Sequence, residues 1–336
     1  MKKTAEYVSL GHPDKTADFI SSYILDQIIK EDKGVKYALE VMVKDNTVIL
    51  GGEVKTSASL DDVEIYVKNA IREVGYNEAY SKIWGHHALD VTKLNIINLI
   101  GLQSPEINYG VEEQQGWGDQ GVFVGYATQG EGYLNKELYL AKKLNNALYY
   151  KAKKETNLGL DIKTQITLDD NGDIETAVVA IPMLEKVEVA DFVIEILGET
   201  PKNLIVNGAG AYSFHSSIAD CGITGRKLAC DFYSTACPIG GGSPWTKDAS
   251  KADLTLNLYA RKLAVENLKD NDECFVYLSS CIGRAELPSA VVKTIKDGKE
   301  TSVEINVDKK PFEIIHELGL DNPVYADLCK NGLVSL

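Results

Sequence analysis

The chain has 336 residues, which is enough for two or three domains with separate cores. It is 44% hydrophobic and 25% charged, and its net charge of −14 argues against a protein that coats nucleic acid or an anionic membrane. The start lacks the apolar segment of a signal peptide, and the apolar run at residues 94–102 is about half of a membrane span. The six cysteines have no C-x-x-C or zinc-finger spacing. We therefore expect a cytoplasmic enzyme with reduced cysteines and with neither a nucleic-acid nor a membrane partner.

The first part of the chain predicts a helix, two strands and a second helix. Apolar side chains recur at helical intervals in residues 14–32. Residues 36–54 predict two strands that turn at Asp45-Asn46, and residues 61–76 return to a helical pattern.

The same order follows twice more. The middle of the chain predicts a helix at 135–154, a hairpin at 163–182 that turns at Asn171-Gly172, and a helix at 188–197. The last part predicts a helix at 250–269, strands at 273–283 and 289–295, and a helix at 312–320.

This recurrence predicts an α+β fold of three structurally similar domains, each an antiparallel β-sheet covered by helices. The expected ranges are an N-terminal domain at 1–104, a central domain at 105–205 and a C-terminal domain at 206–336. The competing explanation is that helices and hairpins simply alternate often in mixed proteins.

The stretch "SLGHPDKTAD" (residues 9–18) carries a histidine, an acid and a lysine at the start of the first predicted helix. Asp14 follows Pro13 and occupies the expected helix N-cap, so capping alone could explain it. Capping does not explain His12 or Lys15. A helix N-terminus beside a histidine and a lysine suits an anion such as phosphate.

Two glycine-containing loops carry further cations. Residues 207–227 end in Arg226-Lys227 after glycines that would allow close approach of a ligand, although such a pair is more often a solvated surface. In residues 240–253, a helix that begins near Asp248 would put Lys247 and Lys251 one turn apart, facing one anion. Asp253 could then hold a divalent cation on the same ligand.

Residues 101–121 are polar and glycine-rich, which is typical of a loop over a site. The candidate phosphate-binding cations are Lys15, Lys163, Arg226, Lys227, Lys247 and Lys251. So many cations in a protein of net charge −14 indicate a polyphosphate with metal rather than a single phosphate.

From about Val8 to Ser289, the motifs "GHPDK", "QSPEIN", "GDQG", "DCGITGRK" and "KDASKAD" resemble, in order, those of the S-adenosylmethionine synthetase (methionine adenosyltransferase) family. The resemblance implies three similar domains around a pseudo-threefold axis. It also implies a homodimer with shared active sites that can pair into a homotetramer. The implied reaction joins ATP to L-methionine and then cleaves the displaced triphosphate, with two Mg²⁺ and one K⁺ per site.

The resemblance also implies roles for individual residues. The catalytic residues would be His12, Lys163, Arg226, Lys227 and Lys247. The ATP-binding residues would be His12, Lys15, Asp161, Lys163, Ala211, Tyr212, Asp220, Arg226, Lys227, Ser243 and Lys247. The methionine-binding residues would be Glu53, Gln103, Asp119, Asp220 and Lys251. The metal ligands would be Asp14 and Asp253 for Mg²⁺ and Glu40 for K⁺, and a gating loop would lie at about 103–113.

The chain departs from the family pattern at several points. Ala211 stands where the family usually has arginine, and "SFHSS" replaces a glycine-rich run and brings in His215, which we interpret as a core or solvated histidine. The gating loop and the tail are short. Because the matched catalytic positions are all present, we favour an active transferase. The alternatives are a triphosphate-hydrolysing relative with weak transfer and an inactive nucleotide-binding regulatory subunit.

Overall fold

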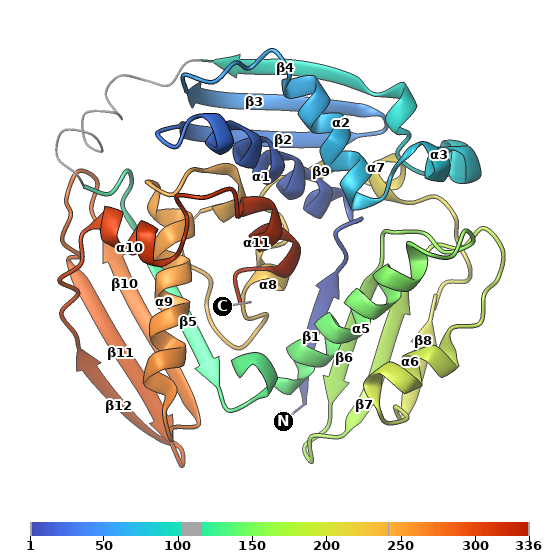
Figure 1. Cartoon of the computed structure of the whole chain (residues 1–336). Coiled ribbons are helices and arrows are strands. Elements are labelled where there is room, and N and C mark those ends of the chain that lie inside the picture. The colour runs from blue at the N-terminus through green and yellow to red at the C-terminus, as the bar shows by residue number, and fades with distance from the viewer. Residues whose placement is uncertain (1, 102–115, 241, 335–336) are drawn as a thin grey trace.

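The computed structural model describes residues 2–101, 116–240 and 242–334. Three four-stranded sheets surround a common centre, and one long helix packs on the inner face of each sheet (Figure 1). These inner helices are α1 (Pro13–Glu31), α5 (Lys136–Ala152) and α9 (Ala252–Leu268). The α+β architecture with three similar units is therefore confirmed.

The first sheet lies against α1 and has the strand order β4-β3-β2-β9. Its strands are β2 (Lys36–Lys44), β3 (Thr47–Lys55), β4 (Asn95–Gly101) and β9 (Gly222–Ile223). The β2–β3 hairpin turns at Asp45-Asn46 as expected, with Asp45 at a φ of 52°. The helices α2 (Val63–Val74) and α3 (Glu78–Trp84) follow the hairpin.

The second sheet, beside α5, has the order β1-β6-β7-β8, and the third, beside α9, has the order β12-β11-β10-β5. The second sheet consists of β1 (Lys3–Val8), β6 (Lys163–Leu168), β7 (Ile174–Ala180) and β8 (Asn203–Val206). The third consists of β5 (Gly121–Thr128), β10 (Glu273–Ser280), β11 (Ser289–Lys296) and β12 (Lys299–Glu304). Within the described ranges, the remaining helices of four or more residues are α6 (Ala190–Leu197), α7 (Ser216–Ala219), α8 (Leu228–Asp231), α10 (Pro311–Glu317) and α11 (Tyr325–Asn331).

The sheets differ from the sequence prediction in two ways. They do not follow the three consecutive ranges, because β1 pairs with β6, β5 pairs with β10, and β9 pairs with β2. They are also not all antiparallel, since β4 runs parallel to β3 and β8 runs parallel to β7. Both differences arise from pairing between distant segments, which local periodicity does not report.

Each inner helix packs on its sheet, and other helices cover further parts of its surface. In α1 the apolar residues Ala17, Ile20, Ile24 and Ile28 are at most 1% exposed. Helix α1 packs against β2, α2 and α11, so polar residues at its start are also enclosed. None of the helices in the described ranges is long and apolar enough to cross a membrane.

Candidate active site

The N-cap of helix α1 is His12, and not Asp14 as expected. His12 has an extended backbone, and its Nδ1 accepts the amide hydrogen of Asp14 at 3.1 Å. In the neutral ring the hydrogen is therefore on Nε2. Burial, with the nearby charges of Lys227 and Lys163, lowers the pKa of His12 to about 3. The ring is thus a neutral hydrogen-bond donor at neutral pH.

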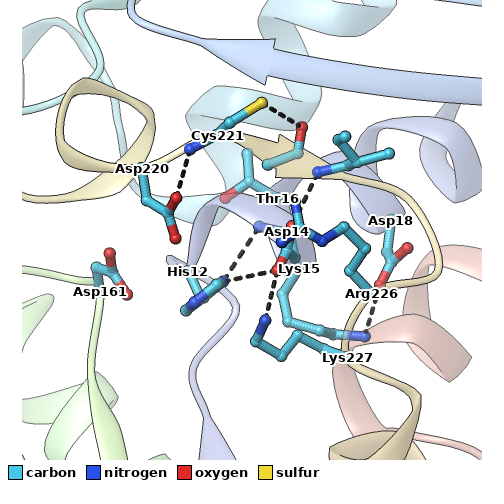
Figure 2. Close-up of polar contacts among 12 residues, drawn as sticks. His12, Asp14, Lys15, Thr16, Asp18, Asp161, Asp220, Cys221, Arg226 and Lys227 are labelled. Atoms are coloured by element: carbon cyan, nitrogen blue, oxygen red, sulfur yellow. Dashed lines mark hydrogen bonds and ion pairs between the residues drawn. The ribbon is translucent and has the colours of Figure 1, made fainter.

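The Asp14 carboxylate is the centre of the first cluster of charges (Figure 2). Its Oδ1 accepts the amide hydrogen of Ile223 at 2.9 Å, and its Oδ2 lies 2.5 Å from the ammonium nitrogen of Lys227. The Arg226 Nε is 4.0 Å from Oδ1, while its side chain is 52% exposed. The "GITGRK" segment therefore brings both of its cations to the start of α1.

Lys15 has a different position from the one expected. Its ammonium group lies 2.7 Å from Asp231 and 3.4 Å from Asp18, and it stacks over the Trp245 ring at 4.9 Å. Although burial opposes the charge, these carboxylates hold the pKa of Lys15 well above its usual value. Lys15 is 3% exposed and is engaged in this buried network, so direct contact with a phosphate does not fit the geometry.

Asp161, Lys163 and Asp220 border the first cluster from two other segments (Figure 2 shows both carboxylates beside His12). The charges of Lys163 and Asp220 act on both His12 and Asp161. Lys163 is exposed at the start of β6. The Asp161 Oδ2 accepts the amide hydrogen of Ser216 at 3.0 Å.

The other oxygen of Asp161, Oδ1, is buried without a hydrogen-bond partner in the described part of the chain. Burial raises the pKa of Asp161 to about 6, against the opposing charge of Lys163. Tyr212 lies within reach of the Asp161 charge and keeps 37% of its surface exposed. Its neighbour Ala211 is exposed and lines a separate cavity of about 420 Å³. The buried oxygen is therefore an acceptor for which the described residues supply no donor.

A second cluster lies at the start of α9. The Asp253 carboxylate accepts the amide hydrogen of Gly242 at 3.0 Å and forms an ion pair with Lys247. These groups line a cavity of about 530 Å³ together with Asp119. The buried hydroxyl of Ser243 has no hydrogen-bond partner within the described ranges.

The prediction that a helix aligns Lys247 and Lys251 is wrong. Lys247 follows a short 3₁₀ turn, Lys251 is the N-cap of α9, and the helix begins only at Ala252. Lys251 is buried, and burial lowers the pKa of its amine. Asp119 lies near enough for its charge to act on Lys251. The loop before α9 therefore brings the two lysines close to each other, and not a shared face of a helix.

Strand β2 connects the two clusters. Its Glu40 accepts the hydroxyl hydrogen of Thr224, two residues before Arg226, and its Ala38 bridges to the backbone of Lys247. Glu53 lies directly opposite Ala38 in the sheet and is exposed. Gln103 and the expected gating loop at 103–113 lie outside the described residues.

The residues that hold the loops in place are not among the residues predicted from the sequence. The Asp18 Oδ1 accepts the amide hydrogen of Gly225, and Thr224 Oγ1 accepts that of Val41. The available signal was that Asp14 and Asp18 are four residues apart, which puts two acids on one side of a helix. Asp231, the partner of Lys15, had no such signal.

Comparisons with known proteins agree with this arrangement. Residues 1–105 match the model of the S-adenosylmethionine synthetase N-terminal domain, and residues 214–335 match that of the C-terminal domain. A solved structure described as an unusual S-adenosylmethionine synthetase, from Campylobacter jejuni, is 32% identical with a TM-score of 0.87. The match covers 100% of this chain and 95% of the other.

The chain belongs to the S-adenosylmethionine synthetase family. The acid–lysine pairs Asp14–Lys227 and Asp253–Lys247 lie within the two segments that the family models match, whereas Asp119, Asp161 and Lys163 lie between those segments. The carboxylates at the starts of α1 and α9 each accept hydrogen bonds from one backbone amide and one lysine.

Proposed function

We propose that the protein is a methionine adenosyltransferase that converts ATP, L-methionine and water to S-adenosylmethionine, pyrophosphate and phosphate. The observation that carries this proposal is the pair of matching carboxylate–lysine sites at Asp14 and Asp253, with Lys163 and Arg226 nearby in the first cluster. Two such sites suit a long polyanion that brings metal ions with it.

In the first step, a lone pair of the methionine sulfur forms the bond to C5′ of ATP. The C5′–O bond breaks, and its electron pair leaves with the triphosphate while the sulfur becomes a sulfonium. Negative charge grows on the bridging oxygen, and the Nε2–H of neutral His12 is a suitable donor to it.

In the second step, water cleaves the triphosphate. We assign the phosphates to Lys163, Arg226, Lys227 and Lys247, and we leave Lys15 out because of its buried pairing. The half-exposed Arg226 has room to move toward a cleaved phosphoryl group and stabilise its charge.

The donor set fits Mg²⁺ that arrives with a phosphate ligand. Within the described residues no group of three or more His, Cys, Asp or Glu side chains could hold a metal by itself. Mg²⁺ is usually held by one or two carboxylates plus substrate phosphates, which is what Asp14 and Asp253 offer. When bound, Mg²⁺ would neutralise part of the phosphate charge. We assign Glu40 to K⁺.

The remaining contacts divide between the two substrates. For the nucleoside we assign Asp161, Tyr212, Asp220, Ser243 and the backbone of Ala211. For methionine we assign Glu53, Gln103, Asp119, Asp220 and Lys251. The free oxygen of Asp161 and the exposed face of Tyr212 support the nucleoside assignment.

We further propose a homodimer with shared sites, able to pair into a tetramer, in the cytoplasm. The outer face of the first sheet carries Met42, Ile97 and Leu99, which are 37%, 38% and 65% exposed. Glu40 and Glu53 lie on the same face. A second copy on this apolar face would therefore lie against expected ligands of the site. Leu99→Glu should convert the dimer to a monomer in light scattering.

An assay of ATP with and without methionine tests the proposed reaction. Formation of S-adenosylmethionine, pyrophosphate and phosphate only with methionine supports transfer. Phosphate without S-adenosylmethionine would favour the triphosphate hydrolase, and absence of turnover would favour the regulatory subunit. His12→Asn should lose the first step, whereas Arg226→Leu should mainly slow triphosphate cleavage, by about 1,000-fold. Equal losses of both steps in both variants would refute these separate roles.

A further inference from the structure

His215 lies outside both charged clusters but close in the chain to Tyr212 and to Asp220, and it is the N-cap of the short helix α7 that begins at Ser216. Its side chain is 1% exposed. The ring packs edge-on against Trp84 at 4.7 Å and against Tyr80 at 6.1 Å. A Cβ atom on Gly159 would come within 3.0 Å of its Nε2, so the chain also approaches the ring closely from the segment before Asp161. His215 is thus a core residue wedged between α3 and two segments of the site.

The hydrogen bonds of His215 fix its tautomer. Nδ1 lies 2.7 Å from the carbonyl oxygen of Ser213, which can only accept, so Nδ1 donates. Nε2 therefore accepts from the hydroxyl of Tyr80 at 2.6 Å. The Tyr80 oxygen in turn accepts the amide hydrogen of Leu160 at 3.3 Å. These three hydrogen bonds form one chain from Leu160 to Ser213.

Both ends of this chain adjoin proposed nucleoside contacts. Leu160 immediately precedes Asp161, and Ser213 immediately follows Tyr212. One residue beyond His215, Ser216 has a φ of 57° and donates its amide hydrogen to the Asp161 carboxylate. The ring therefore holds together the two segments that carry Asp161 and Tyr212.

We propose that His215 is a positioning residue that sets Asp161 and Tyr212 for the nucleoside half of ATP. This inference rests on the proposed function. His215 touches neither the acid–lysine pairs nor the phosphate-binding cations, so it acts on the nucleoside end of the substrate alone. The departure of this loop from the family pattern is then the means by which this chain builds its nucleoside pocket.

The test compares ATP with tripolyphosphate, which has the phosphates but no nucleoside. His215→Phe keeps the ring volume and removes both hydrogen bonds, Tyr80→Phe removes one hydroxyl, and His215→Gln keeps a donor and an acceptor. The exposed His316→Phe is the matched control. For each variant we would measure the dissociation constants of both ligands with Mg²⁺, and KM and kcat for ATP.

We expect His215→Phe to weaken ATP binding and raise its KM about tenfold, because two buried hydrogen bonds are lost. Tyr80→Phe should show a smaller change in the same direction, and His215→Gln should recover part of the loss. The affinity for tripolyphosphate and the value of kcat should stay within about twofold.

Parallel losses for ATP and tripolyphosphate, or no loss for ATP, would overturn this inference. If His215→Phe does not fold, an unchanged ATP affinity in Tyr80→Phe overturns it equally. A wild-type protein that binds tripolyphosphate but not ATP would overturn the proposed function and, with it, this inference. Failure of the inference alone shows only in the variants, while the wild type still binds ATP.

Discussion

The three inner helices carry an acidic residue at the same second position, but only two of them build a charged site. Asp14 in α1 and Asp253 in α9 each accept one loop amide and pair with one lysine. Glu137 in α5 is buried, yet in the described part of the chain it has no ion pair and no side-chain hydrogen bond. The helix start alone therefore does not make the site.

The difference lies in the loop that faces each helix start. Glycine-containing loops that carry Lys227 and Lys247 face α1 and α9. The start of α5 shares a cavity with Asp169, Asp170 and neighbouring residues of the β6–β7 turn. Repetition of the fold supplies three equivalent positions, and the local loop decides which of the acids gains a lysine and a loop amide as partners.

Removal of metal gives the largest expected effect. It tests whether the two acid–lysine sites need the metal for turnover but not for stability of the fold. Chelation of Mg²⁺ should abolish turnover, and its restoration should recover it. The melting temperature should change by no more than about 2 °C, because each carboxylate keeps its lysine and its amide as partners. Loss of the fold on chelation would instead indicate a structural metal.

Neutralising each of the three acids tests the comparison directly. Asp14→Asn and Asp253→Asn should each lower kcat/KM on the order of 100- to 1,000-fold, because a charge that balances the metal is lost. Glu137→Gln is the matched control and should change kcat/KM by no more than about twofold. An Asp253→Asn variant as active as Glu137→Gln would break the equivalence of α1 and α9.

Substitution of two lysines distinguishes the buried ion-pair network around Lys15 from the exposed part of the site around Lys163. Lys15→Met leaves Asp231 and Asp18 buried without their cation and should destabilise the fold by about 3 kcal/mol in urea unfolding. Lys163→Met changes an exposed side chain and should alter stability by no more than about 0.5 kcal/mol. Similar stabilities of the two variants would contradict the role of Lys15 in the buried network.

The smallest expected effect concerns the uncharged region around His215. Burial lowers the pKa of His215 to about 4, against 6.5 in the unfolded chain. Between these pH values the unfolded chain binds more protons than the folded one. The contribution of His215 to the free energy of unfolding is therefore complete above pH 6.5, and it decreases as the pH falls toward 4, by at most about 1.4 kcal/mol per pH unit. Unfolding of wild type and His215→Gln at pH 7 and 5 should show a narrowing difference. A constant difference would contradict this.

The sequence predicts the local elements and most of the charged residues, but not their long-range partners. Helix α1 and the β2–β3 hairpin follow from apolar periodicity and a turn dipeptide, which are properties of neighbouring residues. Lys15 and Lys227 look alike in the sequence, because each is a cation two residues after a proline or a glycine. Only the fold pairs Lys15 with an aspartate 216 residues away. The His215 pocket depends on Tyr80, Trp84 and Leu160 in the same way.

The interleaving of the sheets has a consequence for the order in which the protein assembles during synthesis. Each sheet needs a strand made much later than its first one: β1 waits for β6, β2 for β9, and β5 for β10. No sheet is complete until the ribosome has passed residue 206. At about 5–20 residues per second, β1 stays unpaired for roughly ten seconds or more, with its edge open to other nascent chains.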